Sequence, residues 1–273
     1  MKRAWILGGL ATVAALALLG LHPADLWPGL DGWRQLLRFL GHALQPAWDY
    51  QAAEVPAGAP GFGVELVGRA WTTLLFAAAA MGLALLLAVP LGCLSSERFW
   101  VERRRGARAS ALERLLLSGT RTLLVGLRSV HELLWAILFL AALGLTPLGG
   151  VLALALPYAG TLAKVFAETL DEEDPRASAA LADLGAGATA RLLCADLPLA
   201  WAEWASYAFY RFECCVRSAA ILGFFGYATL GEGLALSFEN GHFREVWSYL
   251  YALIAMALVF ELGSQALRKG ART

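Results

Sequence analysis

The sequence is poor in charged residues and lacks the motifs that hold a nucleotide. Of the 273 residues only 16% are charged, and lysine occurs at just three positions. None of these lysines (Lys2, Lys164 and Lys269) follows the glycine-rich frame of a phosphate-binding loop. We therefore expect that the chain does not hydrolyse nucleotides itself and that it is not an enzyme.

Metal and disulfide frameworks are also missing. The four cysteines (Cys93, Cys194, Cys214 and Cys215) have no CxxC spacing, which argues against a zinc site or a disulfide scaffold. The stretch HELLW at His131 has the His and Glu of a zinc-protease helix, but Trp135 stands where the second histidine is required. No metal site is expected.

Apolar residues are abundant instead. They make up 59% of the chain and give a mean hydropathy of +0.58, above the roughly 45–50% apolar content of soluble domains. Acidic and basic residues balance at 22 each, so no excess of positive charge points to nucleic acid. The composition predicts an all-α integral membrane protein in contact with lipid.

Apolar segments of spanning length predict about six transmembrane helices. The uncharged part of the third segment, residues 133–145, is too short to cross about 30 Å, so this helix must begin earlier and include charges. Within it, Glu132 follows Arg128 by four residues and is predicted to pair with it. The six segments are residues 4–21, 70–96, a stretch ending near 145, 148–165, 199–225 and 246–262.

Positive charges set the expected orientation. Lys2 and Arg3 precede the first segment, residues 97–108 contain five arginines and two glutamates, and Arg268, Lys269 and Arg272 close the chain. Because cytoplasmic loops are enriched in Lys and Arg, both termini are predicted to be cytoplasmic.

The polar segments divide the chain into two parts. Residues 1–64 hold the first apolar segment, which resembles either a cleavable signal peptide or a transmembrane helix. The helix is favoured because the segment is long and has an interfacial ending at His22, Pro23 and Trp27. An amphipathic helix over residues 32–44, capped by Asp31, and an extracytoplasmic loop follow. Residues 65–273 form the core, which includes a cytoplasmic loop at 171–198 and an outer segment at 226–245.

The cytoplasmic loop contains the sequence AALADLGAGATARLLCADLP, residues 179–198. Small residues at Ala179 and Ala180 allow close approach of another protein, Gly185 permits a helix end with positive φ, and Pro198 can open the next helix. The spacing resembles the EAA loop of ABC-importer permeases, a coupling helix that docks on an ATPase. Ala179 replaces the usual glutamate, Asp183 can supply a nearby carboxylate, and Leu197 with Pro198 matches the end of the motif.

Two further stretches, residues 128–170 and 206–226, resemble permease subunits of phosphonate ABC importers. The most specific part is YRFE at 210–213, followed by Arg217, a small pair and ILG at 221–223, within a similarity that spans about residues 65–268. The resemblance implies the type I importer fold in a bacterial inner membrane and import of phosphonate or a related phosphorus oxyanion (phosphite, phosphate). It also implies two ATPase subunits that carry ATP and Mg, a second permease copy or paralogue, and an extracytoplasmic substrate-binding protein.

Three charges in the fifth span need a reason to be there. Arg211 falls near the membrane midplane, where an arginine costs about 2.5–3.5 kcal/mol on insertion scales, and it has no partner on its own helix at i±4. Glu213 and Arg217 are four residues apart and are predicted to neutralise each other. These charges either form interhelical salt bridges or guide an oxyanion along a translocation path, which Arg128, His131 and Glu132 would also line.

Two other functional classes remain open at this stage. The buried Arg and Glu residues could serve an intramembrane enzyme, or the chain could be a membrane scaffold that transports nothing.

Overall fold

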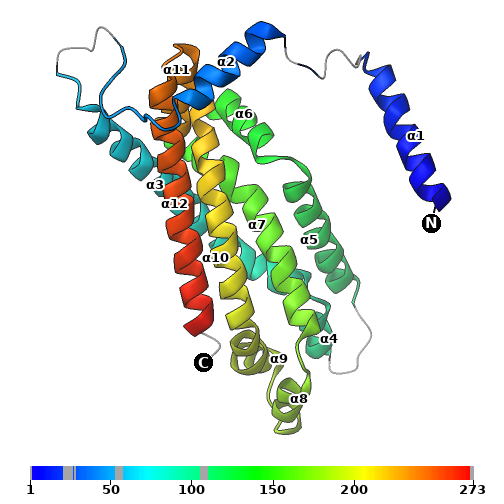
Figure 1. The fold of residues 1–273 in the computed structure, drawn as a ribbon. Coiled ribbons are helices and arrows are strands. Elements are labelled where there is room, and N and C mark those ends of the chain that lie inside the picture. The colour runs from blue at the N-terminus through cyan, green and yellow to red at the C-terminus, as the bar shows by residue number, and fades with distance from the viewer. Residues whose placement is uncertain (1, 21–26, 28, 53–57, 105–109, 271–273) are drawn as a thin grey trace. The chain divides into compact units, whose positions relative to one another are not determined.

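The computed structural model describes residues 2–20, 27, 29–52, 58–104 and 110–270, and the regular structure in these ranges is entirely helical. This confirms the expectation of an all-α protein (Figure 1). The helices are α1 (Lys2–Leu18), α2 (Leu30–Gly41), α3 (Phe62–Ser95), α4 (Glu97–Arg104), α5 (Ala111–Ser129), α6 (Glu132–Leu143), α7 (Pro147–Glu172), α8 (Arg176–Asp183), α9 (Ala188–Arg191), α10 (Leu197–Ile221), α11 (Leu230–Glu239) and α12 (Phe243–Gly270), with a π-helix at Leu192–Asp196 and a 3-10 helix at Leu222–Phe225.

The chain separates into two compact units, residues 1–46 and 47–273. The first unit holds α1 and α2, and the predicted boundary between residues 64 and 65 falls inside α3. The cap of α2 was predicted incorrectly, because Gly29 is its N-cap and Asp31 lies in its first turn, 3.3 Å from Arg34. The predicted interfacial ending at His22 and Pro23 lies outside the described residues.

The core of the second unit is built on close contact between α3 and α7. Ala77, Ala80, Ala84 and Ala88 recur on one side of α3 and are fully buried, as are several alanines of α7. A Cβ built on Gly92 would lie 2.9 Å from Cβ of Phe166, so the two backbones approach closely there. Small residues allow this approach, and the resulting van der Waals contact stabilises helix pairs in lipid, where hydrophobicity alone does not drive them together.

The third predicted span is broken. Helices α5 and α6 meet at 90° because Val130 and His131 are extended rather than helical, and the His131 ring caps the new helix by accepting a hydrogen bond from N–H of Leu133 at 3.3 Å. The predicted pair of Arg128 with Glu132 was therefore wrong, since the two residues lie on different helices and no ion pair joins them in the described structure.

The predicted outer segment contains a helix. After the 3-10 turn, α11 is bent by 47° relative to the preceding helical stretch and packs against α12. Gly231 makes this fold possible, because a Cβ at that position would lie 2.0 Å from the carbonyl oxygen of Ala220. The segment is thus part of the packed core rather than an exposed loop.

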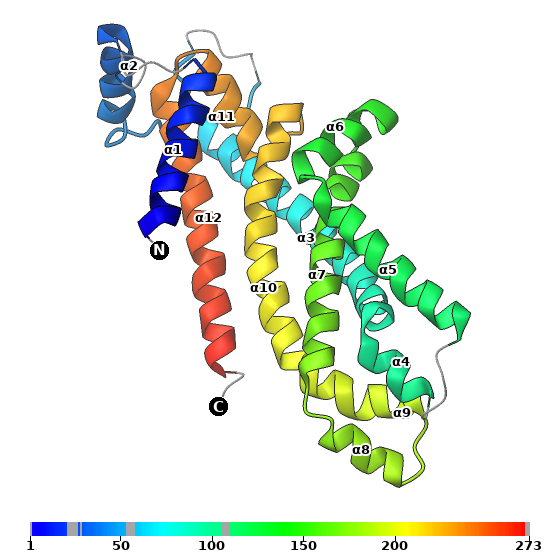
Figure 2. The ribbon, with the colours of Figure 1, turned by 90° about the vertical axis from the view of Figure 1, so that its right-hand side faces the viewer.

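Two ends of the second unit can be distinguished in Figures 1 and 2. Helices α4, α8 and α9 and the C-terminal end of α12 lie toward one end, whereas α6 and α11 lie toward the other. Segments that the charge pattern assigns to the cytoplasm therefore share an end within this unit. Residues 105–109 and 271–273, which carry part of that charge pattern, lie outside the described ranges.

By length and composition, three described helices can cross a membrane: Phe62–Ser95, Pro147–Glu172 and Phe243–Gly263. The two bent pairs, α5 with α6 and the chain from Ala188 to Phe225 with α11, bring the number to five. Residues Trp5–Leu18 of α1 form a shorter apolar helix, which corresponds to the first of the six predicted spans.

Candidate functional site

Arg211 lies partly buried on the side of α10 that faces α7. Its guanidinium carbon is 4.8 Å from the centre of the Tyr158 ring, within the range of a cation–π interaction. The Nε atom of Arg211 is buried without a hydrogen-bond partner, and within the described residues no carboxylate pairs with this side chain. The ring holds the cation in place while leaving its N–H donors available to another acceptor.

A hydrogen-bonded chain runs beside Arg211 and joins α6, α7 and α10. The Ser218 hydroxyl donates to Oε1 of Glu132 at 2.8 Å, and the Tyr158 and Ser218 hydroxyl oxygens are 3.1 Å apart. Since Ser218 has one hydroxyl hydrogen, which goes to Glu132, the Tyr158 hydroxyl must donate to Ser218. Glu132, predicted as a path residue, is thus tied through two hydroxyls to the ring that carries Arg211.

His131 lies next to this chain as the N-cap of α6. Its Nε2 atom is 3.8 Å from Oε2 of Glu132, and its side chain is mostly exposed. The cap explains its position without any chemical role. Within the described part of the chain, no group of three or more His, Cys, Asp or Glu side chains is arranged to hold a metal ion.

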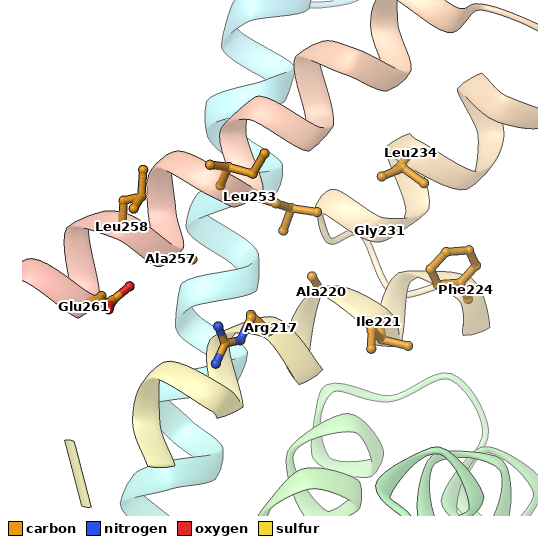
Figure 3. Close-up of a pocket in the computed structure, with 11 residues that line it drawn as sticks. Arg217, Ala220, Ile221, Phe224, Gly231, Leu234, Leu253, Ala257, Leu258 and Glu261 are labelled. Atoms are coloured by element: carbon orange, nitrogen blue, oxygen red, sulfur yellow. The ribbon is translucent and has the colours of Figure 1, made fainter. Parts of the chain in front are cut away.

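The predicted pair of Glu213 with Arg217 is confirmed, with Nη1 of Arg217 3.2 Å from Oε1 of Glu213. The side chain of Glu213 is 10% exposed and that of Arg217 is 55% exposed. Arg217 borders a cavity of about 400 Å³ between α10, α11 and α12 (Figure 3). The lining is apolar apart from Arg217 and Glu261. The cavity therefore has one partly exposed cation and one carboxylate in otherwise apolar surroundings.

Arg128 lies in a different cavity, of about 350 Å³, between α5 and α7. The cavity is lined by the cations Arg121 and Lys164 as well as Arg128, and by the carboxylates Glu168 and Asp171. The spacing of seven residues predicts that Arg114, Arg121 and Arg128 share one side of α5, and two of the three, Arg121 and Arg128, line this cavity. The six predicted path residues therefore fall into separate groups rather than into one site.

The loop at residues 171–198, called the coupling loop after its predicted role, contains an exposed helix, as its sequence predicts. Ala179, Ala180 and Asp183 are exposed on α8, and Gly185 follows with φ of +84°, as predicted for a helix end. Leu184 beside it is 84% exposed. Pro198 stands in the first turn of α10, where its missing N–H does no harm, and Leu197 begins that helix.

A junction that the motif did not predict fixes this loop to the helices. Arg98 forms an ion pair with Asp196 at 2.8 Å, and both side chains are almost fully buried. Arg98 also donates to the carbonyl of Glu173 at 2.6 Å, and Asp171 accepts from the Ser96 hydroxyl at 2.6 Å. Asp196, which lies inside the motif, could have revealed this ion pair from the sequence. A carboxylate directly before the apolar start of a span needs a cation beside it once it is buried.

The opposite end of the unit carries a second polar cluster that sequence reasoning missed. Arg69 pairs with both Glu65 and Glu232, and the Tyr50 hydroxyl donates to Glu65. Burial and this hydrogen bond raise the pKa of Tyr50 to about 12. Nearby, the Glu245 carboxylate accepts from the Ser237 hydroxyl at 2.9 Å. The cluster ties residues 47–52 to α3, α11 and α12, over a sequence separation that no local pattern reveals.

Comparison with known proteins gives consistent matches. The chain is 36% identical over 163 residues to the phosphite transport system permease protein PtxC of Stutzerimonas stutzeri, covering 60% of this chain and 59% of that protein. It is 29% identical over 249 residues to the phosphate-import permease protein PhnE of Mycolicibacterium smegmatis, covering 91% of this chain and 42% of that protein. The chain thus spans about half the length of these two curated relatives. No family model matches it.

Among solved structures, the fold matches the MetNI methionine ABC transporter in inward-facing conformations. The TM-score is 0.63 at 16% identity, and the match covers 77% of this chain and 97% of that one. At this identity the likeness concerns the fold alone. The curated relatives are named as permeases, which agrees with the prediction that the chain is not an enzyme and gives no support to the intramembrane enzyme.

The relatives share a transport class and the solved structure shares the helical arrangement. The chain is similar in sequence to permease proteins of phosphite and phosphate transport systems and shares the all-helical fold of the MetNI transporter chain, with several helices long and apolar enough to cross a membrane.

Proposed function

We propose that the chain is the transmembrane subunit of an ABC importer that moves phosphonate or a related phosphorus oxyanion, such as phosphite or phosphate, into the cytoplasm. The observation that carries this proposal is the joint match to permeases named for phosphite and phosphate transport, over as much as 91% of the chain. The exposed coupling helix α8 supports it, because an importer of this kind is powered by a separate ATPase.

Two such ATPases, each carrying ATP and Mg, dock on the loops at residues 179–198 in this proposal. Exposed Leu184 and the neighbouring small residues supply the contact, and the Arg98–Asp196 junction transmits its movement to α7 and α10. A second permease, identical or paralogous, completes the membrane core. An extracytoplasmic binding protein delivers substrate at the end formed by α11 and residues 47–52.

Arg211 and Arg217 guide the oxyanion in this scheme. Both offer guanidinium donors that match tetrahedral oxyanions in geometry, and each is held by a neighbour, Tyr158 for one and Glu213 for the other. Glu132 and His131 line the approach. The proposed setting is the inner membrane of a bacterium, with both termini in the cytoplasm.

Uptake of labelled phosphite and methylphosphonate tests the path. The host of this chain, with the chromosomal copy deleted, is complemented by the wild type, Arg211→Ala, Arg217→Ala or the control Arg114→Ala. We expect both path variants to lose uptake by at least roughly tenfold, the equivalent of one lost charged hydrogen bond. Membrane levels and co-purification of the ATPase should stay at the wild-type level. Full uptake by both variants would refute the path assignment.

A second experiment tests coupling. Tagged protein should co-purify with an ABC ATPase from its own host, and a combined change of Gly185→Val and Leu197→Ala should abolish uptake. If no ATPase co-purifies and the changed loop still supports uptake, the chain is a scaffold or a transporter of another kind.

A further inference from the structure

The cavity between α5 and α7 differs from the proposed path because several cations line it, two from α5 and one from α7. Three basic side chains, Arg121, Arg128 and Lys164, face two carboxylates, Glu168 and Asp171, which leaves a formal excess of positive charge. Its volume of about 350 Å³ is near the lower end of the range for small-molecule sites. A cavity of this size and sign is suited to a small anion or an anionic headgroup.

The cations keep donors to spare. Nζ of Lys164 pairs with Glu168 at 2.7 Å, and Arg121 uses Nε for the Ser95 carbonyl at 3.0 Å and Nη1 for Glu97 at 2.9 Å. The Nη2 atom of Arg121 is 3.9 Å from Asp171, beyond hydrogen-bond distance. Lys164 and Arg121 are therefore held in place by these contacts, and each still has N–H donors that no protein group in the described structure accepts.

Arg128 has no such partner. Within the described residues no ion pair or hydrogen bond involves its side chain, although it lines the same cavity. Its backbone packs against α7, because a Cβ built on Gly160 would lie 3.4 Å from the Arg128 nitrogen. The packed backbone brings the exposed and unpaired guanidinium of Arg128 to the edge of this cavity, where its donor fork matches a tetrahedral oxyanion.

The depth of the cavity fits the charged layer of a membrane. Lys164 is eight residues before the end of α7 at Glu172, about 12 Å along the helix axis. That end of α7 leads directly into the coupling loop and is, by the charge pattern, the cytoplasmic end. Basic pockets between transmembrane helices at this level bind phosphate-bearing headgroups.

We propose that Arg128, together with Arg121 and Lys164, forms a phosphoryl-anion site between α5 and α7 at the coupling end of the permease. The ligand is a phosphate group, supplied either by an anionic phospholipid or by free phosphorus oxyanion. The site does not depend on the proposed transport function, since it requires only the residues that line this cavity.

Binding to the purified permease, assembled with its ATPase, tests the site. In one arm, native mass spectrometry and thermal melting follow the addition of phosphatidylglycerol, with phosphatidylcholine as the uncharged reference. In the other arm, melting follows inorganic phosphate, with chloride at equal ionic strength. We expect one of the two probes to stabilise the wild type. Arg128→Gln should bind that probe roughly tenfold more weakly, and Arg128→Gln with Lys164→Gln more weakly still.

Arg128→Lys, which keeps the charge, should retain part of the affinity. Arg114→Gln removes a cation from the same helix outside the cavity and should bind as the wild type does. Stabilisation by phosphatidylglycerol alone assigns the site to lipid, and stabilisation by phosphate alone assigns it to a free oxyanion. The proposal is overturned if neither probe binds, or if Arg114→Gln weakens binding as much as Arg128→Gln does. Because this experiment measures binding and not uptake, a negative result here rejects the anion site without bearing on the proposed transport function.

Discussion

At the scale of single residues, the Glu213–Arg217 pair is asymmetric, and this asymmetry can be measured. Glu213 is nearly buried, whereas more than half of the Arg217 side chain is exposed. Arg217→Gln leaves a buried carboxylate without its cation and should cost about 1–3 kcal/mol of stability, whereas Glu213→Gln leaves an arginine that water can solvate and should cost less. Thermal melting of both variants and of the double variant checks this. Equal losses in the two single variants would contradict it.

The raised pKa of Tyr50 predicts that the stability of the folded protein depends on pH through the polar cluster of Tyr50, Glu65 and Arg69. Its pKa is raised to about 12 by burial and by donation to Glu65, so the folded state prefers the protonated phenol. A raised pKa gives a stabilisation that is complete below the unfolded pKa near 10 and is lost as the pH rises through about 12. Melting temperatures between about pH 8 and pH 12 should fall less steeply in Tyr50→Phe than in the wild type. Identical slopes would show that this hydrogen bond contributes nothing.

At the scale of helices, the position of α11 depends on glycines at its contacts, and Gly231 is the one that meets α10. Gly231→Ala would place a Cβ 2.0 Å from the Ala220 carbonyl, so α11 would have to move away from α10. We expect a loss of about 1–3 kcal/mol from this overpacking, together with loss of uptake. Gly119→Ala is the control, because that glycine is also helical and no other heavy atom lies within 4 Å of its added Cβ. Similar melting temperatures for the two variants would contradict the close contact.

Arg98 connects the coupling loop to helix α4. It pairs with Asp196 and also donates a hydrogen bond to the carbonyl of Glu173. A lysine keeps the charge but not the fork that reaches several acceptors. We therefore expect Arg98→Lys and Asp196→Asn to lower uptake on the order of tenfold while the ATPase still co-purifies. Uptake and ATPase hydrolysis rates measured together separate lost coupling from lost assembly. Normal uptake in both variants would mean that the loop acts without this junction.

At the scale of the whole molecule, the sequence predicts the features that depend on apolar periodicity and on local motifs, namely the spans and the coupling loop. Apolar length locates α3, α7, α10 and α12, and the spacing from Ala179 to Pro198 predicts the exposed helix and the positive φ of Gly185. The break at Val130 and His131 was missed because no proline or glycine marks it, and a histidine cap is a weak signal. Contacts such as Arg98 with Asp196 join distant segments, so only the folded chain brings them together.

Orientation of the whole core can be tested with a native reporter. Cys194 is exposed on the coupling loop, whereas Cys93 and Cys214 are half-buried and Cys215 is buried. A maleimide that cannot cross membranes should label the wild type in inside-out vesicles and not in spheroplasts, and bound ATPase should reduce that labelling. Asn240→Cys, placed after α11 at the opposite end, should add a site that reacts in spheroplasts. Because one bilayer separates the two positions, labelling of Cys194 from the outside would reverse the orientation and remove the coupling loop from reach of any cytoplasmic ATPase.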